Sequence, residues 1–397
     1  MNSATPLKEL KVVEFTHMIM GPACGMMLAE LGADVVKVEP PGGDKTRFLA
    51  GSGAGYFPMY NRNKRSICLD LKSAAGKEAA LRLIDEADVF IENFRPGSMD
   101  RLGFGYEALA KRNPGLVYCS EKGFLSGPYE NRTALDEVAQ MMSGLAYMTG
   151  PSGRPLRAGA SVVDVQGAMF GAMGILAALT ERSTTGRGQH ITASLFESAV
   201  FLMGQHMAQF SVTGTAANPM PERISAWAVY DLFETGDGES VFVGVVTDGQ
   251  WKIFCDAFNL QEFASDESLD RNVGRVKQRE RILPRLRKVF EEFTGAELEA
   301  RLEEIGLPFA PVKRPQDLFD DPHLTESGRL QSLTLTDGPN KGRHTRLPTL
   351  PLQFGESKLT LRHDVPAAGE HTREILEGLG YGTADAERMA QQVSQNN

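Results

Sequence analysis

The sequence predicts an α/β protein: a large domain built on a doubly wound parallel sheet, followed by a smaller α+β domain. Short β-branched runs alternate with helical patterns from residue 10 to residue 123, and this alternation is typical of parallel sheets covered by helices. Near residue 212 the composition changes to a stretch rich in Pro, Thr and small residues, which indicates a linker. Beyond it, two strand patterns flank a Gly-Asp-Gly turn and predict a hairpin.

The first strand–helix–strand unit is predicted at residues 10–39. "LKVVEF" is a β-branched run, Pro22 stands near the start of the helix that follows, and Gly32 suits its end. "DVVKVE" gives the second strand. The alternation continues with a helix at 74–87, a strand at 88–93, a mostly helical stretch at 99–112 and a strand at 115–123.

A helix of small apolar residues is predicted to begin at Asp164, and residues 188–210 add one strand and a long helix. The hairpin occupies 227–246, helices follow within 248–305, and a short helix lies within 369–381. The predicted division is a large domain at 1–205, a linker at 206–221, a small domain at 222–325, a second linker at 326–345, and a C-terminal part at 346–397 that returns to the large domain.

The composition indicates a globular protein, because 42% of the 397 residues are hydrophobic and 23% are charged. The net charge of −9 disfavours nucleic acid as a partner. No run of 18 uncharged apolar residues occurs, and the N-terminal sequence lacks a basic segment followed by an apolar one. Neither a membrane span nor a secretion signal is therefore expected.

Cysteine and histidine spacing predicts neither disulfides nor a metal site. The cysteines have no CxxC pair, which favours reduced thiols in the cytoplasm; they are Cys24, Cys68, Cys119 and Cys255. The seven His residues are dispersed, and no metal-ligand spacing occurs.

Asp164 is the most informative single residue. It stands between the apolar run "ASVV" and the helix that follows, where unpaired backbone N–H groups and the helix dipole would hold a carboxylate in its ionised form. An anchored carboxylate of this kind can act as a covalent nucleophile. The alternative is an ordinary helix N-cap, and local sequence alone favours that alternative.

A dinucleotide-binding dehydrogenase is a competing hypothesis for the N-terminal unit. Glu39 fits the acidic residue that such enzymes carry at the end of the second strand. The first turn, however, contains "GPACG" and lacks the first two glycines of the GxGxxG pattern, which let the backbone approach a pyrophosphate. The pattern therefore argues against this class.

Five long segments occur in an order that points elsewhere. They are "LKVVEFTHMIMGPACGMMLAELGADVVKVEPPGGDKTR", "NRNKRSICLDLKSAAGKE", "ADVFIENFRPGSMDRLGFGYEAL", "RAGASVVDVQGAMFGAMGILAAL" and "GEHTREIL". Together they resemble class III CoA-transferases, the family that includes formyl-CoA and carnitine CoA-transferases. The resemblance covers residues 1–205 and 340–397 densely and the middle loosely.

The resemblance implies a Rossmann-like large domain and two elongated subunits interlocked like chain links. It also implies that coenzyme A is a substrate, with no resident cofactor. CoA would move from an acyl-CoA donor to a carboxylic acid through an aspartyl mixed anhydride and an aspartyl-CoA thioester. A carboxylate nucleophile needs no general base, which agrees with a sequence that shows no Ser/His/Asp or Cys/His constellation.

Site residues follow from the same resemblance. Asp164 falls on the nucleophilic aspartate, and the backbone N–H groups of Met18 and Ile19 would stabilise oxyanions. Apart from the resemblance, His17 and Lys122 lie in loops that follow strand ends, where such sheets place ligands, and they are candidates for lining the substrate pocket together with Asp136 and Arg157. The CoA-contacting positions fall on Leu69, Lys72, Asn93, Phe94, Arg101 and Leu102, among which Lys72 and Arg101 can neutralise phosphates.

Departures from the family pattern bear on substrate. Ile19 stands where formyl-CoA transferase has a glutamine, Pro40 replaces a CoA-contacting arginine, and the small domain lacks a run of four glycines. Ile19 disfavours formate and oxalate. We expect succinyl-CoA as donor and a C4–C5 dicarboxylate as acceptor, such as itaconate, mesaconate, citramalate or malate, with His17, Lys122 or Arg157 as the cation for its distal carboxylate.

Two alternatives share the predicted fold. An α-methylacyl-CoA racemase needs acid–base residues on both faces of the α-carbon, but Leu135 precedes Asp136 where racemases have a His. A CoA-binding protein without catalysis would have no need to retain Asp164. CoA transfer is the function that the sequence favours.

Overall fold

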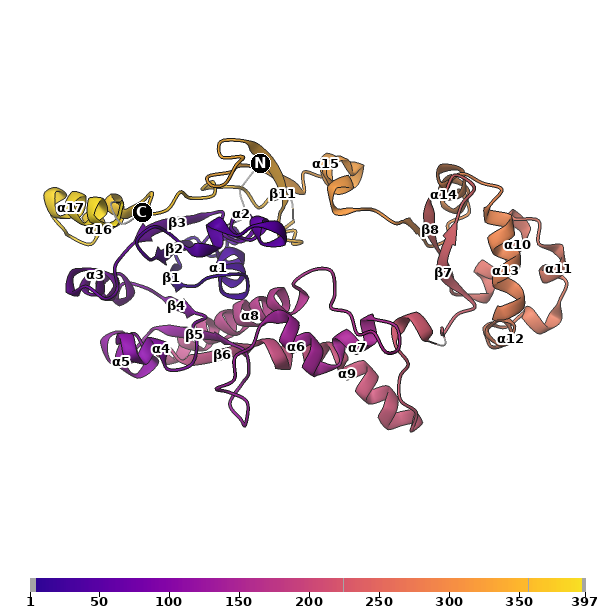
Figure 1. The fold of residues 1–397 in the computed structure, drawn as a ribbon, viewed down its shortest axis with the longest axis horizontal. Helices are drawn as coiled ribbons and strands as arrows, with labels where there is room; N and C mark the ends of the chain where they lie inside the picture. The colour runs from indigo at the N-terminus through magenta and orange to yellow at the C-terminus, as the bar shows by residue number, and fades with distance from the viewer. Residues whose placement is uncertain (1–4, 224, 356, 395–397) are drawn as a thin grey trace. The chain divides into compact units, whose positions relative to one another are not determined.

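The structure, a computed structural model, describes residues 5–223, 225–355 and 357–394. The chain forms two compact units (Figure 1). The large unit comprises Met1–Pro221 together with Glu326–Asn397, and the small unit comprises Glu222–Thr325. All of the residues considered below as an active site belong to the large unit.

The large unit is built on a six-stranded parallel sheet with the order β3-β2-β1-β4-β5-β6. The strands are β1 Lys11–Phe15, β2 Asp34–Glu39, β3 Lys64–Cys68, β4 Val89–Glu92, β5 Val117–Lys122 and β6 His190–Ser194. Val12 pairs with Val35 on one side of β1 and with Val89 on the other. The strand order reverses at β1 and β4, and ligands of such sheets bind beyond the carboxyl ends of the strands at this point.

Helices cover both faces of this sheet (Figure 1). Val12 and Ile91 face a core shared with α1 Met20–Glu30, α8 Val162–Thr185 and α9 Leu195–Thr213. Val13 and Phe90 face a second core, shared with α3 Ala74–Asp85, α5 Tyr106–Arg112, α16 Thr372–Gly378 and α17 Thr383–Ser394. The shorter helices of the large unit are α2 Tyr56–Tyr60, α4 Ser98–Leu102, α6 Asp136–Ser143 and α7 Leu145–Thr149, and α15 Pro322–Glu326 spans the boundary with the small unit.

Strand β3 was not predicted as a strand, because two of its five side chains are charged and Ile67 is its single β-branched residue. Lys64 is fully buried and donates hydrogen bonds to Glu14 Oε1 (2.8 Å), the Pro22 carbonyl (2.8 Å) and Asn61 Oδ1 (3.1 Å). Arg65 pairs with Asp34 on the neighbouring strand. Charges that are satisfied by distant residues hide a strand from an analysis of apolar periodicity.

Three predicted boundaries were wrong. Helix α8 begins at Val162 rather than after Asp164, and α9 continues to Thr213, inside the stretch predicted as the first linker. The second predicted linker, 326–345, contains β10 Leu330–Thr334 and the start of β11 His344–Pro348, which form an antiparallel pair.

Among the described residues, α8 is the one helix long and apolar enough to cross a membrane, but it packs against α1, β5, β6 and α9.

The small unit contains a three-stranded antiparallel sheet of β7 Val229–Glu234, β8 Ser240–Val245 and β9 Phe309–Pro311. The β7–β8 pair is the predicted hairpin, and Glu234 pairs with Ser240 next to its turn. The helices are α10 Asp248–Ala257, α11 Gln261–Ala264, α12 Asn272–Lys277, α13 Arg279–Phe290 and α14 Gly295–Glu304. Their aromatic side chains, Phe254, Phe258 and Phe290 among them, form a separate core.

Candidate active site

A pocket of about 260 Å³ lies beyond the carboxyl ends of the central strands, where the N-termini of α1 and α8 meet. It brings together residues from the first turn, the loop after β5, α6 and α8. Its lining includes His17, Met18, Ile19, Met20, Tyr56, Asn93, Glu121, Lys122, Asp136, Arg157 and Asp164. Eight of the predicted site residues therefore line one cavity: His17, Met18, Ile19, Asn93, Lys122, Asp136, Arg157 and Asp164.

Asp164 lies in the first turn of α8 and is partly buried in this pocket. No described residue forms a hydrogen bond or ion pair with its carboxylate. Burial, followed by the nearby Asp136 carboxylate, raises the pKa of Asp164 to about 7, although Arg157 opposes this shift. We expected the helix terminus to favour the ionised form and so to lower the pKa of Asp164, but the pKa is raised. A carboxylate with a raised pKa and no partner is a reactive group rather than a satisfied one.

Asp136, at the start of α6, provides the cap that sequence alone attributed to Asp164. Its Oδ2 accepts hydrogen bonds from the backbone N–H groups of Val163 (2.9 Å) and Asp164 (3.2 Å). Its Oδ1 accepts from Gln140 Nε2 (2.6 Å) and forms an ion pair with Arg157 (3.2 Å). Because the first N–H groups of α8 are satisfied from outside the helix, the Asp164 side chain is free to face the pocket.

The first turn, between β1 and α1, is held in an unusual conformation. Met18 has a φ of 64°, which bulky residues rarely adopt. Its N–H donates to Thr46 Oγ1 (3.0 Å), while Asn93 binds both the N–H (3.0 Å) and the carbonyl (2.8 Å) of His17. Lys37 Nζ also donates a hydrogen bond to the Thr16 carbonyl (2.7 Å). Strained backbone that is fixed by several partners is common at functional sites.

These contacts correct the predicted oxyanion donors. The Met18 N–H is already engaged by Thr46 and is not available to a ligand in this arrangement. Ile19 is the N-cap of α1, and Met20 is its first residue. No described residue accepts a hydrogen bond from the N–H of either one, and both residues line the pocket. The free donors are therefore shifted by one residue, to Ile19 and Met20.

The three candidate cations differ in their availability. Lys122 Nζ is engaged by both oxygens of Glu92 (2.6 and 2.8 Å) and by the Phe94 carbonyl (2.7 Å). Burial lowers the pKa of His17, so its imidazole is neutral at pH 7. Arg157 is partly exposed, and among the described residues it forms an ion pair with Asp136 only; its guanidinium also donates to the carbonyls of Ala158 (3.2 Å) and Ala160 (3.3 Å). Arg157 is therefore the cation best placed to meet an anionic group in the pocket.

The predicted CoA-contacting residues differ in how accessible their side chains are. Lys72 and Arg101 have exposed side chains, available to phosphates. The Leu69 side chain is buried in the core, so only its backbone is able to contact a ligand. Phe94 and Leu102 pack partly against the same core, and the Phe94 ring contacts the His17 ring at a tilt of 58°, with 5.2 Å between centroids. Asn93 lines the pocket, but its amide holds the first turn.

Glu39 does not support dinucleotide binding. Its carboxylate is buried against Arg47 (2.6 Å) and also accepts from Ser66 Oγ (2.6 Å) and the Asp44 N–H (2.7 Å). The Arg47 guanidinium holds the pKa of Glu39 below its ordinary value, against the effect of burial. A carboxylate with these partners has no free oxygen for a ribose hydroxyl.

Sequence analysis missed Glu121, which lies on β5 and lines the pocket. Burial raises its pKa to about 8 against the opposing effect of the Cys24 thiol, and the charges of Glu14, Asp164 and Glu92 add to the rise. The signal in the sequence is a charged residue inside the strand pattern "LVYCSEKG". An acidic residue at a strand end is common, so its burial against α1 and α8 became evident only in the fold.

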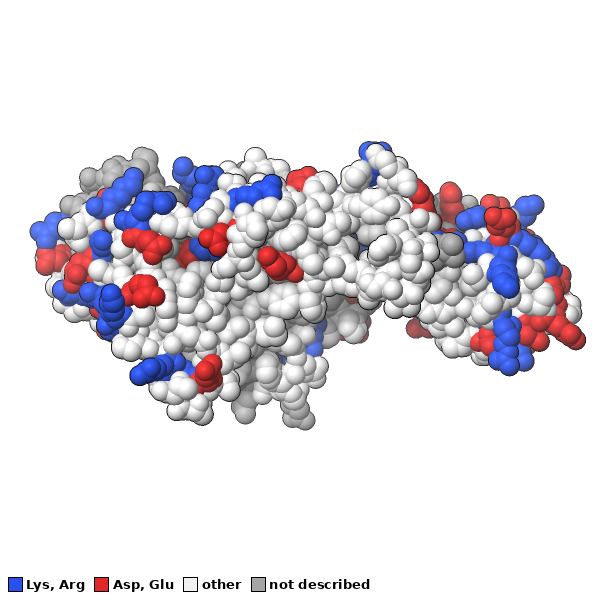
Figure 2. Space-filling view, turned by 90° about the horizontal axis from the view of Figure 1, so that it is seen from below, with Lys and Arg blue, Asp and Glu red and all other residues white. Residues whose placement is uncertain are grey.

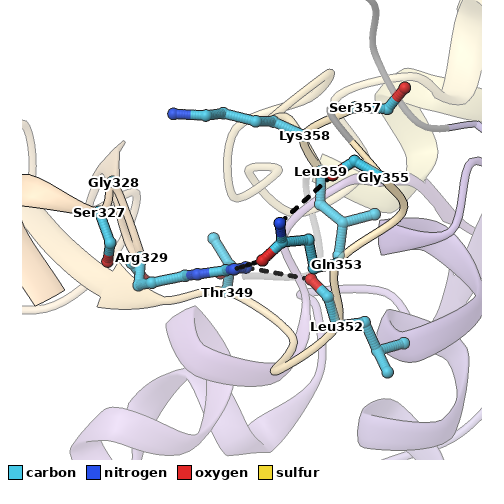
Figure 3. Close-up of a pocket in the computed structure, with 10 residues that line it drawn as sticks. All are labelled: Ser327, Gly328, Arg329, Thr349, Leu352, Gln353, Gly355, Ser357, Lys358 and Leu359. Atoms are coloured by element: carbon cyan, nitrogen blue, oxygen red, sulfur yellow. Dashed lines mark hydrogen bonds between the residues drawn. The ribbon is translucent and has the colours of Figure 1, made fainter.

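A second cavity in the large unit is bigger, about 340 Å³, but offers no comparable chemistry (Figure 3). Arg329 donates to the Leu352 carbonyl (3.0 Å) and to Gln353 Oε1 (3.0 Å) across it. Among the residues that the structure describes, its lining includes Lys358 and no carboxylate, thiol or imidazole. The pocket that contains Asp164 is therefore the candidate active site.

Comparison with known proteins shows the family to which the chain belongs. Residues 7–372 match the family model described as CoA-transferase family III. The chain is 35% identical to a succinyl-CoA:mesaconate CoA-transferase of Haloarcula hispanica over 95% of this chain and 97% of that protein. It is 37% identical to an acetyl-CoA:oxalate CoA-transferase of Acetobacter aceti over 77% of this chain and 80% of that protein.

A solved structure agrees over nearly the whole chain. A CAIB/BAIF family protein from Brucella suis superposes with a TM-score of 0.82 at 33% identity, covering 96% of this chain and all of the other. The mixed α/β arrangement, with a central parallel sheet and separate antiparallel sheets, is therefore shared with a solved relative.

Proposed function

This chain belongs to CoA-transferase family III, and from that premise we propose that it moves CoA from succinyl-CoA to a C4–C5 dicarboxylic acid by covalent catalysis on Asp164. The observation that carries the proposal is the Asp164 carboxylate, which has a raised pKa and no described partner in the pocket. Such a group is suited to attack on a thioester.

The first half of the proposed reaction transfers the donor acyl group. An Asp164 oxygen attacks the thioester carbon of succinyl-CoA, the C–S bond breaks, and a mixed anhydride and a CoA thiolate form. The thiolate then attacks the aspartyl carbonyl of the anhydride and releases succinate, which leaves CoA bound to Asp164 as a thioester. No proton is transferred in either step, so no general base is needed.

The second half reverses these steps with the acceptor. A carboxylate oxygen of the acceptor attacks the aspartyl-CoA thioester, which gives a new mixed anhydride and frees the thiolate. The thiolate attacks the acceptor carbonyl, forms the new acyl-CoA and regenerates the Asp164 carboxylate. Each tetrahedral oxyanion would meet the free N–H groups of Ile19 and Met20 at the start of α1, an arrangement that stabilises developing negative charge.

The acceptor is not fixed by family membership, because the two relatives named above use mesaconate and oxalate. Ile19 has an apolar side chain and offers no side-chain hydrogen bond to a compact polar acid. Arg157 supplies one cation in the same pocket, which suits the distal carboxylate of a longer acid. We therefore propose itaconate, mesaconate, citramalate or malate as the acceptor, with Arg157 as its anchor.

We also propose that the enzyme is an interlocked homodimer. Long apolar side chains are exposed on α8 and α9, including Met169 (57%), Met173 (59%), Phe201 (71%) and Phe210 (54%). In Figure 2, charged side chains are sparse over the middle of the large unit, where α6, α8 and α9 lie in Figure 1. Apolar surface of this kind is typical of a subunit interface, which supports the proposal.

A substrate panel tests the function. Succinyl-CoA is incubated with each of the four dicarboxylates and with oxalate, formyl-CoA is incubated with oxalate, and the CoA esters are identified by mass. We expect faster turnover with succinyl-CoA and a C4–C5 dicarboxylate than with formyl-CoA and oxalate. Oxalate as the best acceptor would contradict the argument from Ile19. Solvent deuterium at the α-carbon of a 2-methylacyl-CoA would instead support a racemase.

Replacing Arg157 tests the anchor. The informative quantity is the ratio of kcat/KM for glutarate to kcat/KM for butyrate, because loss of Arg157 also changes the charge beside Asp164 and affects both acids. Arg157→Gln should lower this ratio by about 10- to 100-fold, since a hydrogen bond to a charged group contributes about 1.5–3 kcal/mol. Arg154→Gln, in the same loop and exposed, is the control. An unchanged ratio in Arg157→Gln would rule out the anchor.

A further inference from the structure

The floor of the Asp164 pocket contains a carboxyl group that the proposed reaction does not use. Glu121 has 2% of its surface exposed. Neither of its side-chain oxygens has a hydrogen-bond partner among the described residues. A buried, ionised carboxylate without partners is very costly, whereas a neutral carboxylic acid is much less so.

The surroundings of Glu121 are apolar or weakly polar. The Sγ atoms of Cys24 on α1 and Cys119 on β5 and a carboxylate oxygen of Glu121 all lie within 4.8 Å of one another. From α8, Gly171 leaves the space that the carboxyl occupies: a Cβ at this position would lie 2.4 Å from Glu121 Oε1. The neighbours on these three elements are thiols and a glycine, and none of them carries a positive charge.

The charged groups around Glu121 also favour its neutral form. The acidic neighbours are Glu14 on β1, Glu92 on β4 and Asp164 on α8. Three lysines are paired with these acids: Lys64 (2.8 Å) and Lys37 (3.7 Å) with Glu14, and Lys122 with Glu92 (2.6 Å). A negative charge on Glu121 would therefore lie under the nucleophile with no cation of its own.

We infer that Glu121 is a positioning residue of the transfer site, which must remain a neutral acid beneath Asp164 for CoA exchange to proceed. This inference rests on the proposed function. Asp164, the CoA thiolate and the acceptor carboxylate are all anionic, and each occupies the pocket above Glu121 during the cycle. Deprotonation of Glu121 adds a like charge to a poorly solvated site, and this charge repels the Asp164 carboxylate, the CoA thiolate and the acceptor carboxylate.

The inference predicts a bell-shaped dependence of activity on pH. The acid limb reflects ionisation of Asp164, whose pKa is about 7, and the alkaline limb reflects ionisation of Glu121, whose pKa is about 8. Because the two groups interact, both limbs report apparent values of the pair. Above the upper value, kcat/KM should fall about tenfold per pH unit.

The test compares pH profiles of the wild type and Glu121→Gln, which keeps the size of the side chain and stays neutral. Glu137→Gln, which removes an exposed carboxylate at the rim of the same pocket, is the control. Glu121→Gln should lose the alkaline limb up to about pH 9.5 and keep the acid limb, and Glu137→Gln should keep both. An alkaline limb that persists unchanged in Glu121→Gln overturns the inference while CoA transfer itself stands.

A second measurement does not depend on activity. It uses the Asp164→Asn background, because Asp164, with a pKa of about 7, would otherwise add its own protonated-carboxyl band. In Asp164→Asn at neutral pH, infrared difference spectroscopy should show the C=O stretch of a protonated carboxyl group, which should disappear as the pH rises through about 8 and be missing in Asp164→Asn/Glu121→Gln. Absence of the band in Asp164→Asn overturns the inference, even if no acid in the panel accepts CoA. A stoichiometric metal ion in the purified protein would also overturn it, because a metal-bound carboxylate is ionised.

Discussion

Replacing Asp164 with Asn should make the protein more stable at neutral and alkaline pH, although it removes the nucleophile. The folded protein holds the Asp164 carboxyl at a pKa of about 7, against 3.8 for the free side chain. Between these values the folded state binds the proton more tightly than the unfolded state does. Stability is therefore lost as the pH rises from about 4 to about 7, and the full cost persists above that range.

The size of this effect follows from the same shift. A rise of about three pKa units corresponds to an upper limit of about 4 kcal/mol. The side chain is partly exposed, and solvent screening reduces the expected value to about 2 kcal/mol. Asn cannot ionise, so Asp164→Asn should gain about this much at pH 8 and almost nothing at pH 4.

Thermal unfolding of both proteins at these two pH values measures the gain. A stabilisation of 1 kcal/mol raises Tm by about 2–4 °C in a domain of 150–250 residues, so a difference of a few degrees is expected at pH 8. Glu137→Gln serves as the control for loss of a nearby exposed charge. If Asp164→Asn has a lower Tm than the wild type at pH 8, Asp164 stabilises the start of α8 as a cap and the reasoning is refuted.

Two further predictions concern Asp136 and the subunit arrangement. Asp136→Asn removes the like charge that raises the pKa of Asp164, so the acid limb of kcat/KM should move to lower pH; an acid limb that stays in place would contradict the assigned cause. An interlocked homodimer should bury more than the ~1,600 Å² of a standard interface and should not dissociate on dilution, because the subunits can separate only by unfolding. Sedimentation that shows a reversible monomer at low concentration would contradict this arrangement.

The elements that sequence analysis located are those whose own residues determine them. The strands at 34–39 and 88–93 contain the β-branched or aromatic residues Val35, Val36, Val89 and Phe90, and each lies between two neighbouring strands in the sheet. The small domain predicted at 222–325 has the same limits as the small unit. Strand β3 was not predicted, because the burial of Lys64 depends on Glu14, which is distant in sequence.

The site shows the same dependence on distant partners. Asp164 was identified because family resemblance and its position before an apolar helix coincide. The true start of α8 was missed because Asp136 supplies the cap from another helix. The engagement of the Met18 N–H by Thr46 and the isolation of Glu121 are likewise properties of tertiary contacts, which local patterns do not record.

The most direct test of the central claim is to trap the covalent intermediate. Hydroxylamine cleaves an aspartyl thioester or anhydride and leaves a hydroxamate on the aspartate, which peptide mass spectrometry locates. After addition of succinyl-CoA, the modification should map to Asp164, and it should be missing without acyl-CoA and in Asp164→Ala. A modification at Asp136 or Glu137, or full CoA-transferase activity in Asp164→Ala, would contradict the account.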